Sequence, residues 1–281
     1  MAGRLLVVGT PIGNLGDLTP RAAEALRNAD LVVAEDTRMA HRLLAHIGAK
    51  RPVVSYNDHS PSGRTGELLE RLGRDETIAL TTDAGMPGVS DPGPRLVEAA
   101  RAAGAAIEVV PGPSAVTAAI AASGVEALGF VFGGFLPPRP ASARRTALQR
   151  LLGTSGTAGL PLVLFEAPHR AAALLADLEA LVPESRVAAC RELTKLHEEV
   201  VIGTPAEVGA TLAAPRGELT FVVSQIPPAA APAVDVDLDA LVAAAESAGL
   251  PQRTVVELLR AAGVPRREAY RASGKRDVTG R

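Results

Sequence analysis

The chain has 281 residues, a formal net charge of −2 and one cysteine, Cys190. A single cysteine excludes an internal disulfide and a zinc site built from cysteines, and we expect no bound metal. The length allows one large domain or two smaller ones, each with a hydrophobic core. The N-terminal region lacks the apolar stretch of a signal peptide, and no apolar run reaches about 18 residues, so we expect a cytoplasmic protein without a membrane span.

Positive charge is concentrated in two segments of the sequence. Residues 137–150 carry four arginines and no acid, and residues 252–281 carry eight basic residues and three acidic ones. Basic islands on an acidic body are typical of a surface that binds phosphates, but ordinary solvated helix faces have the same pattern. Charge alone leaves both interpretations open.

Short β-branched runs alternate with helix-length stretches rich in Ala, Leu and Arg along most of the chain. This alternation predicts α/β layers with a largely parallel sheet. Thr19-Pro20 predicts a helix that begins at the proline and ends near Asn28. Pro113-Ser114 predicts another helix, which ends near Ser123. The expected strands cover residues 4–9, 30–34, 52–55, 77–81, 106–110, 130–132, 161–165, 186–190, 198–202 and 218–224.

The same pattern predicts the domain organisation, because it pauses at Ser123-Gly124 and Gly129. A later stretch rich in Pro and Ala is typical of a linker. The expected divisions are an α/β domain over residues 1–120, a second α/β domain over 121–225, a linker over 226–236, and a segment of two or three short helices with a disordered basic tail over 237–281.

Loops at the carboxyl ends of the expected strands have an unusual composition, and this is where α/β sheets bind ligands. The loop 9–17, GTPIGNLGD, favours a binding loop over a plain turn. Its glycine spacing is not GxGxxG, and the chain has no GxxxxGK(S/T) motif, so a Rossmann dehydrogenase and a P-loop NTPase both lose their main support. The loop 35–38, EDTR, places two acids beside an arginine, although Asp36 also fits the N-cap of the next helix.

Two further loops combine glycine and proline. The loop 82–94 contains two aspartates and a serine among several glycines and prolines. The glycines let the backbone approach a ligand closely, and the prolines hold the loop rigid. The turn 111–115, PGPSA, leads into a helix N-terminus, whose free N–H groups suit a carboxylate or another anion. Both loops favour a ligand site at this edge of the sheet.

These loops, in this order, resemble the tetrapyrrole (corrin/porphyrin) methylase superfamily and, more closely, its ribosomal RNA small-subunit methyltransferase I branch. The resemblance covers about residues 4–225, and residues 263–270 are similar to the branch's C-terminal helical segment. The motifs that carry it are GTPIGNLGD (9–17), AEDTR (34–38), DAGMP (83–87), SDPG (90–93), PGPSA (111–115), GFLP (134–137), FEAPHR (165–170) and RELTK (191–195).

The resemblance implies two α/β domains of tetrapyrrole-methylase type with S-adenosylmethionine in the cleft between them, a small C-terminal helical segment, and usually a homodimer. The implied reaction is 2′-O-methylation of a cytidine, with small-subunit ribosomal RNA or the 30S particle as the partner. Two alternatives stay open: methylation of a tetrapyrrole small molecule on the same scaffold, and a non-catalytic RNA-binding protein that binds no cofactor.

The resemblance also assigns residues to the cofactor, and the charge of side chains in the motifs and in the first basic island predicts contacts of an RNA substrate. The expected contacts of the cofactor are Pro11, Asp83, Gly85, Met86, Pro87, Val89, Ser114, Ala115, Phe165, Glu166, Gly217 and Glu218. The expected contacts of the substrate are Arg38, His59, Arg144, Arg145, His169, Arg170 and Arg191, where Arg144 and Arg145 come from the first basic island.

The catalytic group is less sharply defined, because a ribose hydroxyl needs a base or a charge that stabilises the alkoxide. The preferred candidates are Glu35, Asp36, Glu192 and Lys195, and the others are His59, Glu166, His169 and Glu198. The chain departs from the branch at Met86, Asn57 and Ser60, which leaves the roles of those side chains open.

Overall fold

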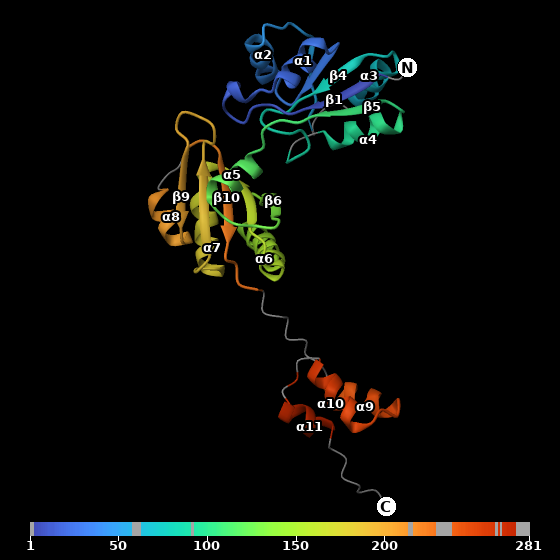
Figure 1. Ribbon diagram of the computed structural model, residues 1–281, viewed down its shortest axis with the longest axis vertical. Coiled ribbons are helices and arrows are strands. Elements are labelled where there is room, and N and C mark those ends of the chain that lie inside the picture. Colours follow the sequence, from blue (N-terminus) through green and yellow to red (C-terminus); the bar gives the residue numbers. More distant parts are fainter. Residues whose placement is uncertain are drawn as a thin grey trace, which may run out of the picture. The chain divides into compact units, whose positions relative to one another are not determined.

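The computed structural model describes residues 3–57, 63–90, 93–212, 216–228, 238–261, 264 and 266–273 (Figure 1). The chain divides into two compact units, residues 1–229 and residues 230–281. Two five-stranded sheets lie in the first unit. His59 lies outside the described residues, as do most of the expected linker and the expected basic tail.

The first sheet is entirely parallel, in the strand order β3-β2-β4-β1-β5. Successive residues of its central strands are buried, as Leu5 and Leu6 are, because helices cover both faces. Its strands are β1 (Arg4–Val8), β2 (Leu31–Ala34), β3 (Val53–Ser55), β4 (Thr77–Leu80) and β5 (Ala106–Val110). One face packs against α1 (Pro20–Asn28) and α2 (Thr37–His46), and the other packs against α3 (Gly63–Gly73) and α4 (Pro94–Ala102).

Side-chain caps fix where the first two helices begin. The Thr19 hydroxyl accepts a hydrogen bond from the Ala22 amide at 3.1 Å, so the predicted start of α1 at Pro20 is confirmed. Asp36 is the N-cap of α2 and accepts from the Arg38 amide at 2.8 Å. This cap ends the loop after β2 within two residues and keeps Glu35 at the carboxyl end of that strand.

The second sheet has the order β6-β7-β10-β8-β9, and only β6 and β7 pair in parallel. The prediction of a largely parallel sheet is therefore wrong for this half of the unit. A short loop joins β8 to β9, and a connection of that length allows only an antiparallel pair. The strands are β6 (Val131–Phe135), β7 (Leu162–Glu166), β8 (Arg186–Arg191), β9 (Glu199–Gly203) and β10 (Leu219–Ser224).

This antiparallel arrangement decides which residues meet at the edge of the sheet. Leu219, at the amino end of β10, pairs with Glu166 at the carboxyl end of β7 and with Arg191 at the carboxyl end of β8. The segment that precedes β10 therefore lies at the same edge as the loops that follow β7 and β8.

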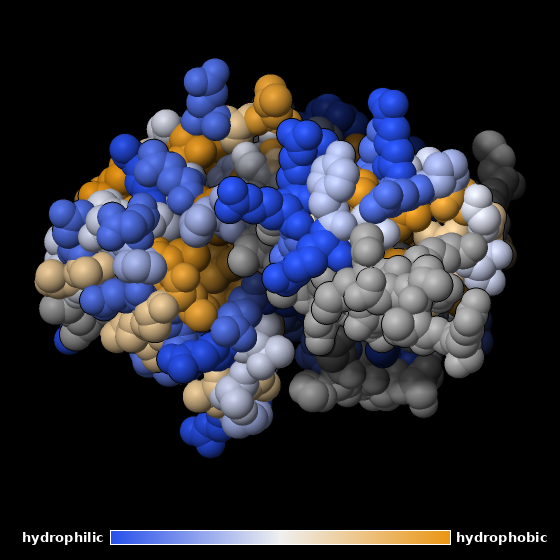
Figure 2. Space-filling view, turned by 90° about the horizontal axis from the view of Figure 1, so that it is seen from below, coloured by the Kyte–Doolittle hydropathy of each residue, from blue (hydrophilic) through white to orange (hydrophobic). Residues whose placement is uncertain are grey.

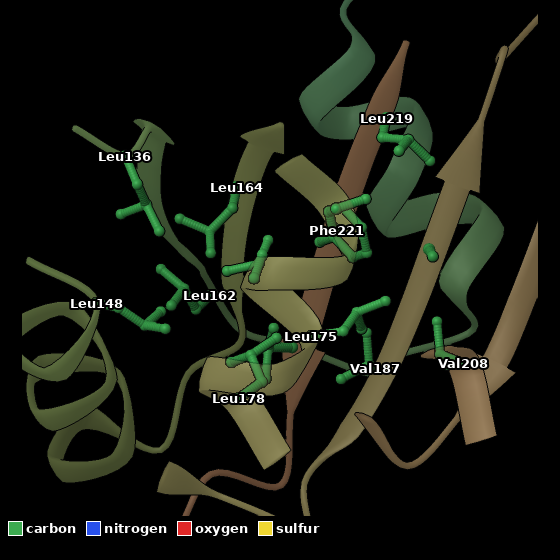
Figure 3. Close-up of a cluster of buried hydrophobic side chains, with 14 of the residues drawn as sticks. Leu136, Leu148, Leu162, Leu164, Leu175, Leu178, Val187, Val208, Leu219 and Phe221 are labelled. Carbon is green, nitrogen blue, oxygen red and sulfur yellow. The ribbon is translucent and has the colours of Figure 1, made fainter. Parts of the chain in front are cut away.

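Helices cover both faces of the second sheet as well. The helix α5 (Ala115–Ser123) packs on one face, where Val116 contacts the same cluster as Val163 and Val222. The other face is a cluster of leucines around Phe221 (Figure 3). It is covered by α6 (Ala141–Ala158), α7 (Ala171–Leu181) and α8 (Pro205–Thr211). The domain boundary at residue 120 stays a prediction, and the packing of α5 favours a boundary before Ala115.

All ten expected strands are present, with ends shifted by at most three residues. In the described part of the second unit, α9 (Leu238–Ser247), α10 (Gln252–Ala261) and α11 (Arg266–Ser273) pack around a small apolar cluster.

Hydrophilic side chains cover much of the face shown in Figure 2, with apolar patches between them. Among the described helices, none is long and apolar enough to cross a membrane.

Candidate active site

A cavity of about 420 Å³, which we call the main cavity, lies where loops from the two sheets meet. The first sheet contributes the loops that follow β1, β2, β4 and β5, and the second contributes the ends of β6, β7, β8 and β10. Its described wall consists of Ile12, Glu35, Asp83, Ala84, Gly85, Met86, Val89, Ser90, Ser114, Ala115, Phe135, Phe165, Glu166, Ala167, Pro168, Cys190, Leu193, Glu218, Leu219 and Thr220.

Most residues predicted to contact the cofactor are in this wall. They are Asp83, Gly85, Met86, Val89, Ser114, Ala115, Phe165, Glu166 and Glu218. Pro11 lines a neighbouring cavity of about 340 Å³, which we call the side cavity, and Pro87 and Gly217 line neither. Among the predicted catalytic residues, Glu35 lines the main cavity and Lys195 lines the side cavity.

The loops of the first sheet approach one another through their backbones. Gly9 and Gly112 touch: a Cβ on Gly9 would lie 2.6 Å from the Gly112 nitrogen and 2.6 Å from the Met86 sulfur. Thr10 and Gly85 form an isolated antiparallel bridge. Gly85 has φ +84°, but a Cβ there would lie 3.5 Å from its nearest neighbours, so its requirement for glycine is conformational rather than steric. Of these glycines, Gly85 lines the main cavity, while Gly9 and Gly112 hold together the loops that carry other residues of its wall.

Glu192, Lys195 and Glu218 form a charged network at the edge of the second sheet. Lys195 Nζ donates to Glu192 Oε1 at 2.9 Å and to Glu218 Oε2 at 3.0 Å. Glu192 Oε1 also accepts from the Glu218 amide at 2.9 Å. Glu192 has φ +51°, a strained conformation for this residue type, and a Cβ on Gly217 would collide with its carboxyl group. Gly217 therefore makes room for Glu192.

The network fixes the protonation of both partners. The hydrogen bond from Lys195 and the one from the Glu218 amide hold the pKa of Glu192 below its ordinary value. Burial lowers the pKa of Lys195, but the hydrogen bonds to Glu192 and Glu218 outweigh burial and leave that pKa raised. Lys195 is therefore a fixed ammonium in this structure, which suits it to stabilise negative charge rather than to accept a proton.

Glu166 is a buried carboxyl in the wall of the main cavity. Its Oε1 accepts from the Ala167 amide at 2.9 Å and lies 3.1 Å from Arg170 Nε. Its Oε2 is buried without a hydrogen-bond partner among the described residues. Burial raises the pKa of Glu166, against the opposing effects of the Ala167 amide and Arg170. An unpartnered oxygen in a cavity wall is a free acceptor for a ligand.

Several predicted substrate contacts are already engaged inside the protein. Arg170 donates to the Leu136 carbonyl at 2.8 Å, and its side chain is 16% exposed. Arg144 and Arg145 both pair with Asp177 at 2.8 Å, and the Arg144 side chain is 13% exposed. The fold thus brings Asp177 to a basic island whose own sequence contains no acid. Less of the island's positive charge is therefore available to RNA than the sequence predicts.

The remaining predicted residues lie nearer the surface. Arg38 pairs with Asp36, and this ion pair, with the amide of Arg38, lowers the pKa of Asp36 to about 2. The Asp36 amide donates to Asp83 Oδ1 at 3.0 Å, which ties the loop after β2 to the loop after β4. Arg191 pairs with Glu199 at 2.9 Å, and His169 is exposed.

Some wall residues lie inside the sequence motifs but were not among the predicted ligand contacts. Ile12 and Leu193 are apolar residues inside motifs that were assigned for their polar members, and Phe135 lies in the GFLP motif. Burial raises the pKa of Cys190 to about 11, so this thiol is a neutral part of the wall. Nothing near Asp177 in the sequence signals its pairing with two arginines. In the described part of the chain, no cluster of three His, Cys, Asp or Glu could hold a metal.

Fold and cavity together define a two-lobed α/β protein with a ligand site at the strand ends. A family model described as "Tetrapyrrole (Corrin/Porphyrin) Methylases" matches residues 4–209. A solved structure of uroporphyrin-III C-methyltransferase from Thermus thermophilus with S-adenosyl homocysteine is 20% identical, with a TM-score of 0.58, over 80% of this chain and 98% of that chain. A diphthine synthase structure has a TM-score of 0.65 at 17% identity, over 79% of this chain and 90% of that one.

Curated relatives narrow the class. "Ribosomal RNA small subunit methyltransferase I" of Synechocystis sp. is 39% identical over 99% of this chain and 100% of its own length. The relative of the same name from Thermotoga maritima is 41% identical over 79% of this chain and 98% of its own length. The chain belongs to the tetrapyrrole methylase family and, within it, to the ribosomal RNA small subunit methyltransferase I group.

Proposed function

We propose that this chain is an S-adenosylmethionine-dependent methyltransferase that methylates a cytidine 2′-hydroxyl of small-subunit ribosomal RNA. The observation that carries the proposal is the main cavity, whose wall holds most of the residues that the family resemblance assigns to the cofactor. The names of the relatives supply the RNA substrate. We further propose that the protein works in the cytoplasm as a homodimer, which analytical ultracentrifugation would test.

The wall of the main cavity fits the proposed cofactor chemically. Ile12, Met86 and Leu219 offer apolar contacts to the flat and aliphatic parts of such a ligand. The buried Oε2 of Glu166 offers an unpartnered acceptor for an N–H donor. The helix α5 begins at Ala115 in the same wall, where free backbone N–H groups suit a carboxylate.

When bound, S-adenosylmethionine supplies an activated methyl group, and the protein positions the nucleophile. Glu35 lies in the wall of the main cavity, and its carboxylate is the group that would take the proton of the substrate hydroxyl as the oxygen is methylated. Lys195 holds a positive charge in the adjoining side cavity and can stabilise a developing alkoxide. Glu192 and Glu218 hold that ammonium in place.

The alternative of a tetrapyrrole substrate rests on neighbours of the same fold. The uroporphyrin-III C-methyltransferase structure is 20% identical to this chain, and that level of likeness supports the fold alone. The relatives named for ribosomal RNA are about twice as similar, at 39% and 41% identity. The RNA substrate is therefore favoured.

The test is a methyl-transfer assay with labelled S-adenosylmethionine. Small-subunit particles from cells that lack this protein are compared with a porphyrinogen, and ribose methylation is mapped on the RNA. Label in one cytidine ribose supports the proposal. Label only in the porphyrinogen, or no cofactor binding by calorimetry, overturns it.

A further inference from the structure

The side cavity adjoins the main cavity. The two share Ile12, Asp83, Ala84 and Glu218, so a ligand in one would contact the wall of the other. The loop after β1, the helix α2, the end of β4 and Lys195 supply the described wall of the side cavity. Apart from Pro11, Asp83 and Glu218, the sequence motifs assign no ligand contact of the cofactor to this wall.

One part of this wall is apolar and accessible. Leu15 is 41% exposed and Met39 is 39% exposed, although both are large hydrophobic side chains. With Pro11 and Leu43 they line the same hollow, which suits a flat aromatic ring. An apolar surface of this kind can stack against a nucleobase that has left the base stack of its RNA.

Another part of the wall offers a polar group without a partner. Thr82 is 4% exposed, and its hydroxyl has no hydrogen-bond partner among the described residues. Thr81 and Thr10, its neighbours in the wall, bond to carbonyls instead. A buried hydroxyl left unpaired costs free energy unless a ligand satisfies it.

The rim carries a cation that forms no ion pair with the described residues. Arg42 is exposed on α2, and its Nη1 makes a weak contact of 3.8 Å with the Met39 sulfur. Most other arginines of the site region pair with a carboxylate, as Arg38 does with Asp36. A guanidinium beside an apolar hollow matches the layout of a nucleotide, a base next to a phosphate.

We propose that the side cavity receives the target nucleotide in an unstacked conformation, with Arg42 at a backbone phosphate, Thr82 at a polar group of the nucleoside and Lys195 beside the reacting hydroxyl. This assignment rests on the proposed function. Methyl transfer requires the two reacting atoms to come within about 3–3.5 Å, and the shared wall of the two cavities allows that approach.

The test separates binding of the two substrates. Arg42→Ala, Arg42→Glu and Thr82→Val are compared with Arg95→Glu on α4, which covers the opposite face of the first sheet, and with Thr154→Val on α6. S-adenosylmethionine affinity is measured by calorimetry, and KM and kcat are measured with small-subunit particles. We expect Arg42→Glu to raise the KM for particles about tenfold or more. Arg42→Ala should reduce the salt slope of RNA binding by about 0.7.

Thr82→Val should lower kcat/KM by about fivefold to tenfold, because it removes one hydrogen bond without changing the shape of the wall. All these variants should keep the parent's cofactor affinity. A matching loss of cofactor affinity would assign the side cavity to the cofactor and overturn the inference. Unchanged KM and salt slope in the Arg42 variants would overturn it as well. If the parent itself binds the cofactor but methylates no RNA, the proposed function fails first, and this assignment fails with it.

Discussion

The two sheets of the first unit contribute to the main cavity and the side cavity in different ways. The loops of the first sheet are shaped by backbone: Gly9 against Gly112, and Thr10 bridged to Gly85. The second sheet contributes charged side chains that hold one another, Glu166 with Arg170 and Lys195 between two glutamates. One half therefore depends on the absence of side chains and the other on their pairing.

This difference implies different sensitivities. A backbone contact fails when any atom is inserted, since two main chains have little freedom to move apart. A charged network fails when one partner is removed, since the remaining charge is left uncompensated. Substitutions in the two halves should therefore differ in kind as well as in size.

The largest effect is expected at Gly9. In Gly9→Ala the added methyl would lie 2.6 Å from the Gly112 nitrogen, so the two loops must separate. We expect a loss of about 2–3 kcal/mol in unfolding free energy and at least a tenfold loss of cofactor affinity. Calorimetry and denaturant unfolding measure the two quantities.

Two other glycines serve as controls for Gly9. Gly104→Ala has φ +80° and open space around the new methyl, so it should cost only the conformational penalty of about 1 kcal/mol and leave cofactor binding unchanged. Gly85→Ala combines φ +84° with the cavity wall and should fall between the two. Equal behaviour of the three variants would contradict the steric account of Gly9.

The next largest effect is expected in the charged network. Lys195→Met removes the ammonium that both glutamates hold, and we expect kcat to fall about a hundredfold, as for the loss of one preorganised donor to a developing anion. Cofactor affinity should change little, because Lys195 lines the side cavity. Single-turnover kinetics with small-subunit particles measure the effect. Lys50→Met, at an exposed position, is the control, and a Lys195→Met rate within twofold of that control would rule out this role.

Glu166 should produce a smaller effect that depends on pH. Burial raises its pKa above the ordinary value of 4.5, so the folded protein binds this proton more tightly than the unfolded chain does. The contribution of Glu166 to the stability of the parent should therefore fall as pH rises from about 4.5 through the raised pKa. Glu166→Gln carries no such charge, and its stability relative to the parent should increase over that window. Thermal unfolding across the window tests this, and a difference that stays flat with pH would contradict it.

The features that could be predicted from the sequence are those set by local patterns, and the features that could not are those set by pairing between distant segments. The glycine- and proline-rich loops are local patterns, so the positions of Asp83, Gly85 and Ser114 in the main cavity agree with the motifs. The strands were also predicted, since buried β-branched runs are local. The antiparallel course of β10 was not, because it depends on pairing between distant segments. The same holds for Asp177, which lies in an Ala- and Leu-rich helix and becomes informative only when the fold brings Arg144 to it.

The smallest effects on catalysis are expected from the basic islands. The sequence predicts that the arginines of residues 139–145 matter more for RNA binding than those of the C-terminal island, but the structure treats these charges differently. Arg144 pairs with Asp177 and is 13% exposed, so Arg144→Ala should cost about 2 kcal/mol of stability and change RNA binding little. Arg145, at 55% exposure, retains a surface for phosphate. In the second unit, Arg266 and Arg267 are exposed on α11, and Arg266 lies 5.9 Å from the ring of Tyr270.

Charge removal in the second unit should therefore act on RNA binding without a cost in the stability of the sheets. We expect Arg266→Ala/Arg267→Ala to lower the salt slope of RNA binding by about 0.7–0.9 for each phosphate that these arginines neutralise in the parent, with cofactor affinity unchanged. The effect on kcat should be the smallest of the series, because neither arginine lines the main cavity or the side cavity. Binding at several salt concentrations measures the slope. If Arg144→Ala weakened RNA binding more than the double variant did while leaving stability intact, the ion pair with Asp177 would not hold in solution, and the second sheet would use its charges for RNA rather than for its own structure.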